Sequence, residues 1–198
     1  MKLIDAIKNE RGNPFYVSNS SRNDLPLLFK ELGFKTGVEV GVYKGEYSEK
    51  FCEQGLHMNL VDPWIVYKNY RKHPKELPYN ELEEITRKRL LPYDCNIIKA
   101  NSMDALASIP DGSADFVYID SNHSLPYIAQ DIYEWNRKVK VGGIISGHDY
   151  FNGSNNPYWI RICHVKYVVD VCTKIFGIDN YYVIGDRDKR PSWMWVKK

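Results

Sequence analysis

Short apolar runs recur along the chain, and longer segments with apolar residues at helical spacing separate them. A run of about four to eight apolar or β-branched residues is typical of a buried strand. By this pattern we expect strands over residues 36–40, 58–61, 96–99, 115–119 and 144–146. Gly142 and Gly143 turn the chain into the last of these. Two late strands are expected over 181–184 and 194–197.

Amphipathic segments between these strands predict helices over residues 22–33, 46–53, 79–91, 102–107, 125–137 and 164–176. Gly33 closes the first of them, and Gly55 and Gly177 follow two others, as helix-terminating glycines do. Strands that alternate with helices predict an α/β fold with a doubly wound, mostly parallel sheet, and the late strands predict a C-terminal antiparallel pair. We expect a single domain over 1–198 that begins with a helical segment over 1–35.

Ligands of such sheets bind beyond the carboxyl ends of the strands, so the residues that follow each strand carry the functional signal. The first strand leads into the turn Glu39–Gly45. Gly41 lets the backbone turn sharply and approach a ligand, and Gly45 allows close packing where the next helix starts. Free backbone N–H groups there favour a carboxylate or a phosphate. The turn lacks the GxGxxG dinucleotide pattern, and alone it is equally consistent with an ordinary strand-to-helix turn.

Asp62 ends the second strand, 23 positions after Glu39. An acid at this spacing can accept hydrogen bonds from both hydroxyls of a ribose. It can also cap a helix before Pro63, and the two roles are compatible. Ser102, after the third strand, can cap its helix or place a hydroxyl near an adenine edge.

Carboxylates and imidazoles follow the fourth and fifth strands. Asp120 and His123 come after one, and His148 and Asp149 come after the other. Asp120 and Asp149 can share a divalent cation such as Mg²⁺. They can equally act as base and orienting partner with the histidines, and His123 alone is as consistent with a capping or surface role.

Three segments together resemble the class I S-adenosylmethionine-dependent methyltransferases: VEVGVYKGEYS (38–48), IDSNHSLPYIAQDIYEW (119–135) and GGIISGHDY (142–150). The resemblance implies the Rossmann-like methyltransferase fold and S-adenosylmethionine as cofactor. Its implied cofactor contacts are Glu39, Gly41, Tyr43 and Gly45 on the methionine part, Asp62 on the ribose with Trp64 beside the adenosine, Ser102 and Met103 on the adenine, and Asp120 near the methionine end and the acceptor.

The chain departs from the magnesium-dependent relatives of this group after the fifth strand. They usually carry a further acid or amide pair there, whereas this chain has His148 and Asp149. The departure leaves a metal at Asp120 and Asp149 open and favours a histidine base. We expect methyl transfer to oxygen, with His148, His123 or a carboxylate taking the hydroxyl proton. The alternatives are a metal-dependent hydroxylase or another non-methylating enzyme on this fold, a dinucleotide or nucleotide-sugar enzyme, and a cofactor-binding protein without chemistry.

The composition of the chain limits the classes of binding partner that we expect. The net charge of +2 gives no reason to expect nucleic acid or a membrane, and we interpret the basic runs 87–89 and 187–190 as solvated. Four cysteines without a CxxC pair, and no apparent signal peptide, predict a cytoplasmic protein. Residues 64–92 and 150–162 are expected to form a substrate lid, and their aromatic residues suit a sugar or another small molecule. We leave a homodimer open.

Overall fold

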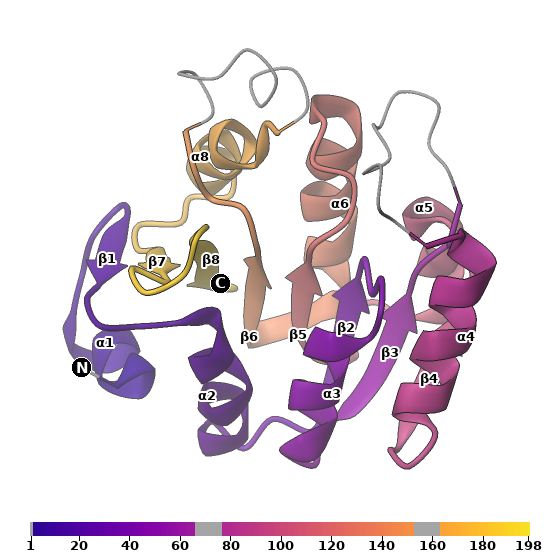
Figure 1. Cartoon of the computed structure of the whole chain (residues 1–198). Coiled ribbons are helices and arrows are strands. Elements are labelled where there is room, and N and C mark those ends of the chain that lie inside the picture. Colours follow the sequence, from indigo (N-terminus) through magenta and orange to yellow (C-terminus); the bar gives the residue numbers. More distant parts are fainter. Residues whose placement is uncertain (1, 66–76, 153–162) are drawn as a thin grey trace.

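The computed structural model describes residues 2–65, 77–152 and 163–198. Residues 66–76 and 153–162, which belong to the two expected lid segments, lie outside the described residues. Its centre is one eight-stranded sheet in the order β1-β7-β8-β6-β5-β2-β3-β4 (Figure 1). The strands are β1 (Phe15–Val17), β2 (Thr36–Val40), β3 (His57–Val61), β4 (Cys95–Ile98), β5 (Ala114–Ile119), β6 (Val139–Gly147), β7 (Tyr182–Ile184) and β8 (Ser192–Val196).

Only β8 runs against its neighbours, since it pairs antiparallel with both β6 and β7, and the other pairings are parallel. The prediction of a mostly parallel α/β sheet with a C-terminal antiparallel pair is therefore confirmed. Alternate strand residues face opposite sides, which gives the fold two hydrophobic cores. Val117 and Ile119 of β5 belong to one core, whereas Phe116 and Tyr118 belong to the other.

Helices cover both faces of the sheet (Figure 1). One core includes side chains of α1 (Leu3–Asn9), α2 (Leu25–Glu31), α3 (Glu46–Glu53) and α4 (Tyr79–Leu90). The other includes side chains of α5 (Ser102–Ala105), α6 (Leu125–Lys138) and α8 (Val165–Ile175). Short 3₁₀ turns, η1 (Arg22–Asp24) and η2 (Leu106–Ser108), precede α2 and follow α5. No helix within the described ranges is long and apolar enough to span a bilayer.

Two elements differ from the pattern-based expectation. The N-terminal segment contains helices, but it also contributes β1, which forms a sheet edge by pairing with β7. Three residues are too few to show a strand period, so only the long-range pairing reveals this strand. In addition, β6 starts at Val139, so Gly142 and Gly143 lie inside the strand. The register of β6 against β5 shifts between Ala114 and Phe116, and such an irregularity accommodates glycines within a strand.

The order of the strands brings the predicted ligand positions together. β2 lies between β3, the next strand along the chain, and β5, which comes later in the chain. The strand order therefore reverses at β2, and this position is a topological switch point. The Asp120 N–H donates to the Val40 carbonyl oxygen at 2.8 Å, and the His148 N–H donates to the Ile119 carbonyl oxygen at 3.0 Å. The segments that follow β2, β5 and β6 therefore meet at one edge.

Candidate active site

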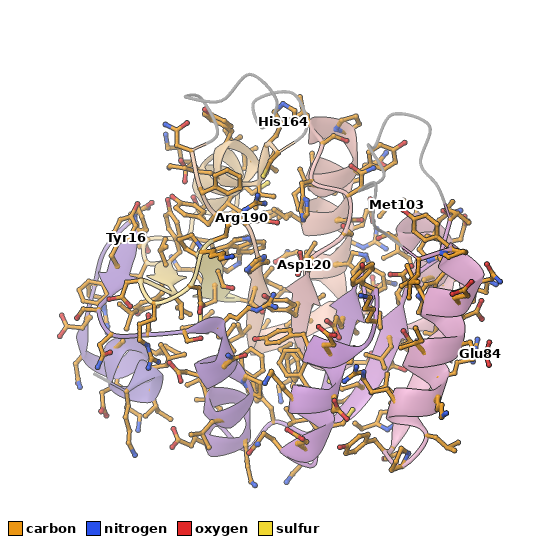
Figure 2. All side chains as sticks on the ribbon, viewed as in Figure 1. Tyr16, Glu84, Met103, Asp120, His164 and Arg190 are labelled. Atoms are coloured by element: carbon orange, nitrogen blue, oxygen red, sulfur yellow. The ribbon has the colours of Figure 1, made fainter. Side chains whose placement is uncertain are left out.

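A cavity of about 340 Å³ opens at the carboxyl ends of β2, β3 and β5, and we call it the strand-edge cavity. Figure 2 shows Asp120 at this edge, between Arg190 on one side and Met103 on the other. The predicted site residues that border the cavity are Glu39, Gly41, Tyr43, Asp62, Ser102, Asp120 and His123. They come from four different strand ends, so the topology gathers them.

Asp62 holds the backbone turn that follows β2 and borders the cavity. Its Oδ2 accepts the backbone N–H groups of Val42 and Tyr43, both at 2.9 Å, and its Oδ1 accepts the Trp64 N–H at 2.7 Å. Burial raises the pKa of Asp62 and outweighs these N–H donors, which lower it. An ionised carboxylate offers about four acceptor positions, and these bonds occupy three. Asp62 therefore holds the turn and keeps acceptor capacity toward the cavity.

The two glycines of this turn have different structural roles. A Cβ on Gly41 would lie 2.3 Å from the Asp120 carbonyl oxygen, and its φ of +95° disfavours any side chain. Gly41 thus allows the ends of β2 and β5 to touch. Gly45 also has positive φ, but a Cβ there would meet Thr86 and Leu90 of α4 at 3.1 and 3.2 Å. It serves helix packing and does not border the cavity.

Glu39 lies at the floor of the cavity and is 2% exposed. The Ser48 hydroxyl of α3 donates to its Oε2. Burial raises the pKa of Glu39 to about 8, against the lowering effect of the Ser48 hydrogen bond. The buried carboxyl group therefore retains its proton at neutral pH until a cation reaches it.

Trp64 and Met103 lie outside the cavity wall. Trp64 is buried, and its indole N–H donates to the Tyr43 carbonyl oxygen at 2.9 Å, so it supports the turn from behind. Met103 is partly buried and packs against the core beside α6. Thr86 donates to the same Tyr43 carbonyl at 2.7 Å, which ties α4 to the turn.

A buried carboxylate of α6 stands behind the far wall of the cavity. Asp131 is 3% exposed and accepts hydrogen bonds from the hydroxyls of Ser102 and Ser121, both of which border the cavity. Trp135 donates to the Ser102 oxygen at 2.7 Å. With their protons held by Asp131, the two serine oxygens present acceptors to a ligand. Sequence reasoning missed Asp131, although it lies within the segment that resembles the family.

Asp120, His123, His148 and Asp149 gather in space, and we call them the carboxylate–imidazole cluster. His123 Nε2 lies 3.3 Å from Asp120 Oδ1 and 3.1 Å from Asp149 Oδ2. His148 Nδ1 lies 3.8 Å from Asp120 Oδ1 and 3.6 Å from Asp149 Oδ2. Asp120 and His123 border the strand-edge cavity, whereas His148 and Asp149 lie behind them.

The cluster perturbs the acidities of its members. Burial lowers the pKa of His123, but the Asp120 hydrogen bond and the Asp149 charge more than compensate, so its pKa is raised. Burial alone would raise the pKa of Asp149, yet interactions with His148 and His123, together with Arg190, hold it well below its ordinary value. Asp149 is therefore ionised at neutral pH.

Two arginines pair with the acids of the cluster, and no local sequence pattern indicated either contact. Arg22 Nη1 of η1 lies 3.5 Å from Asp120 Oδ2, and Arg190 Nη1 lies 3.0 Å from Asp149 Oδ1. Arg22 also lies over the Tyr47 ring at 4.7 Å. Arg190 belongs to the basic run 187–190 that we expected to be solvated, so this residue has a partner at the site.

Several solved structures have this fold. An O-methyltransferase from Bacillus cereus in complex with SAH is 13% identical, with a TM-score of 0.65, over 89% of this chain and 80% of that one. The O-methyltransferase TomG from Streptomyces achromogenes, in complex with SAM, is 12% identical, with a TM-score of 0.60, over 89% and 79%. Spermidine synthase from Thermotoga maritima is 12% identical, with a TM-score of 0.59, over 87% and 57%.

These identities show a shared fold, and the fold alone also carries other chemistry. No curated protein matches the chain. The model of a family described as a methyltransferase domain matches residues 38–150, from the strand that precedes Gly41 to the end of the GHDY segment. Because this match spans more than half of the chain and contains nearly all of the residues around the strand-edge cavity, the protein belongs to the methyltransferase-domain family.

Proposed function

We propose that the protein transfers a methyl group from S-adenosylmethionine to a hydroxyl oxygen of a small molecule. One observation carries the proposal: the glycine turn with its acids Glu39 and Asp62 borders the same cavity as Asp120 and His123 of the carboxylate–imidazole cluster. A methyl donor bound along the turn would have its reactive end next to Asp120 and His123. The structures solved with SAM or SAH on this fold support the choice of cofactor.

The cofactor would bind across the strand ends. Glu39 suits the amino group of the methionine part, since a cation favours ionisation of a buried carboxyl group. Asp62 has acceptor capacity left for one ribose hydroxyl, and Ser102 and Ser121 present acceptors to the amino group of adenine. Tyr43 and Gly41 line the turn between them, while Gly45, Trp64 and Met103 would act from behind.

Methyl transfer needs mainly in-line positioning, because the sulfonium methyl is already activated. The acceptor oxygen would attack the methyl carbon while the carbon–sulfur bond breaks and the sulfur keeps the electron pair. The hydroxyl proton would pass to the cluster at Asp120 and His123, its two members that border the cavity. Asp120 and Asp149 both contact Nε2 of His123 and would orient the ring, and His123 would accept the proton only in its neutral form. His148 would support the cluster from the side away from the cofactor.

The cluster also fits a divalent cation. Asp120, His123 and Asp149 each offer one ligand atom, and these atoms lie within 4.8 Å of one another. A carboxylate–imidazole donor set suits metals that accept nitrogen, such as Zn²⁺, better than Mg²⁺, which prefers oxygen ligands. A cation held there would polarise an acceptor oxygen. Arg22 and Arg190 already compensate part of the acidic charge of this donor set.

The test measures cofactor binding and methyl transfer separately. We expect calorimetric titration to show SAH binding to the purified protein, and SAM turnover with a panel of small hydroxyl compounds to release SAH. His123→Gln should retain SAH binding and lose turnover. His57→Gln, which changes a histidine at the opposite end of β3, should match the wild type in both measurements. Absence of SAH binding by the wild type would refute the proposed function.

The acceptor class, the assembly and the location are inferred from the cavity and the composition. A small-molecule or sugar acceptor is supported by the size of the cavity, and Ile65 and Tyr79 from the first expected lid segment border it. The four cysteines are free thiols, which is consistent with the predicted cytoplasmic location. A homodimer stays a prediction, and sedimentation analysis of the purified protein would test it.

A further inference from the structure

The loop over residues 185–190 is fixed to the N-terminal segment by its acids. Asp186 accepts the backbone N–H groups of Asn19 and Ser20, both at 2.7 Å. Asp188 accepts the Arg22 N–H at 2.7 Å and the Ser21 hydroxyl at 2.9 Å. These hydrogen bonds hold the loop in one position and occupy its carboxylates.

The two carboxylates of this loop keep their charge, and Arg187 interacts electrostatically with Asp186, but their hydrogen bonds turn them toward the N-terminal segment. A second cavity of about 330 Å³, which we call the basic cavity, is bordered by Arg22, His148, Arg187, Asp188, Lys189 and Arg190. Four of these six residues are cations, and the single acid among them is Asp188, which already accepts two hydrogen bonds. A cavity with this lining attracts anions.

The basic cavity adjoins the proposed reaction site. Arg22 borders both cavities. His148 borders the basic cavity, and its Nδ1 lies 3.8 Å from Asp120 Oδ1, which places the cavity directly beside the carboxylate–imidazole cluster. A molecule in the strand-edge cavity could therefore extend past Asp120 to the basic loop.

The arginines of the basic cavity pair with acids: Arg22 with Asp120, Arg187 with Asp24 and Arg190 with Asp149. Arg187 pairs with Asp24 at 3.0 Å, but both side chains are largely exposed, and such pairs contribute little. Lys189 is exposed, and among the described residues no acid forms an ion pair with it. Arg187 and Lys189 do not contact the cluster, so charge balance at Asp120 and Asp149 does not account for them.

We infer that the basic cavity binds an anionic group of the acceptor, a carboxylate or a phosphate ester, while the hydroxyl to be methylated lies at Asp120 and His123. This inference rests on the proposed function and narrows its substrate class to hydroxy acids or phosphorylated hydroxy compounds. Arg187 and Lys189 would select the acceptor by its charge and take no part in the methyl transfer itself.

The first test uses inorganic phosphate as the probe. Phosphate, added at constant ionic strength, should raise the thermal stability of the wild type, because a ligand of the folded state stabilises it. Lys189→Glu should weaken the apparent phosphate affinity about tenfold, the change expected for reversing one charge near an anion in water. Lys30→Glu makes the same charge change on α2, away from both cavities, and should leave the affinity as in the wild type.

The second test compares paired acceptors in the SAM turnover assay: a hydroxy acid with its amide, and a sugar phosphate with its sugar. We expect the anionic member of an active pair to have the higher kcat/KM, and Lys189→Glu to remove most of that preference with SAH binding unchanged. Whichever of the two pairs is methylated shows whether the anionic group of the acceptor is a carboxylate or a phosphate ester. Equal phosphate stabilisation of wild type and Lys189→Glu, or a preference for the neutral members, would overturn the inference. Failure of SAH binding would refute the proposed function and leave the phosphate result standing.

Discussion

Replacement of Glu39 by glutamine should make the protein more stable and less able to bind its cofactor. Burial raises the pKa of Glu39 from an ordinary 4.5 to about 8. Since the folded state holds the proton more tightly than the unfolded state, stability is lost as pH rises from 4.5 toward 8. At pH 7, about 2.5 pH units above the ordinary pKa, the loss is about 3 kcal/mol at about 1.4 kcal/mol per unit.

Glutamine has the same shape as the protonated carboxyl group, and its carbonyl can accept the Ser48 hydrogen bond without titrating. Glu39→Gln should therefore exceed the wild type by about 3 kcal/mol at pH 7 and match it near pH 4. For a chain of this length, that corresponds to a rise in Tm of roughly 6–12 °C. The variant should bind SAH more weakly, because a neutral amide cannot pair with the ammonium group.

Urea unfolding of both proteins at pH 4, 7 and 8.5 would measure the difference, and calorimetric titration would measure SAH affinity. Glu53→Gln, an exposed position at the end of α3, is the control and should change neither quantity. A Glu39→Gln difference that does not vary with pH, or a variant less stable than the wild type at pH 7, would refute the assigned buried state of this carboxyl group.

Three further substitutions test the residues that hold the walls of the strand-edge cavity in place. Asp62→Asn removes the negative charge of the side chain that accepts the Tyr43 N–H. SAH binding should weaken by about 1–3 kcal/mol in calorimetric titration. Unchanged affinity would exclude Asp62 from the site. Gly41→Ala should abolish SAH binding and lower Tm, because the added methyl group would overlap the Asp120 carbonyl oxygen. A Tm equal to that of the wild type would contradict this close approach. Asp131→Ala should cost about 1–3 kcal/mol in urea unfolding because two serine hydroxyls lose their buried acceptor. A neutral effect would argue against that network.

The local elements could be predicted from the sequence because their signals lie in neighbouring residues. The apolar run 115–119 is buried along its whole length as β5, and the segment 125–137 is amphipathic and forms α6. Gly41 was predicted from the sequence as a sharp turn that approaches a ligand, and the structure adds that it lets the end of β2 touch the end of β5. The methyltransferase family followed from these local motifs.

Contacts between distant segments were decided only by the tertiary structure. β1 pairs with β7, and Arg22 reaches Asp120, although no periodicity links either pair. The structure also separates His123, at the cavity wall, from His148, which borders the basic cavity, while both follow strands in the same way. A motif specifies which side chain leaves a strand end, because backbone geometry is local. Which partner that side chain meets depends on strand order and on loops anchored elsewhere, and both are set by packing across the whole chain.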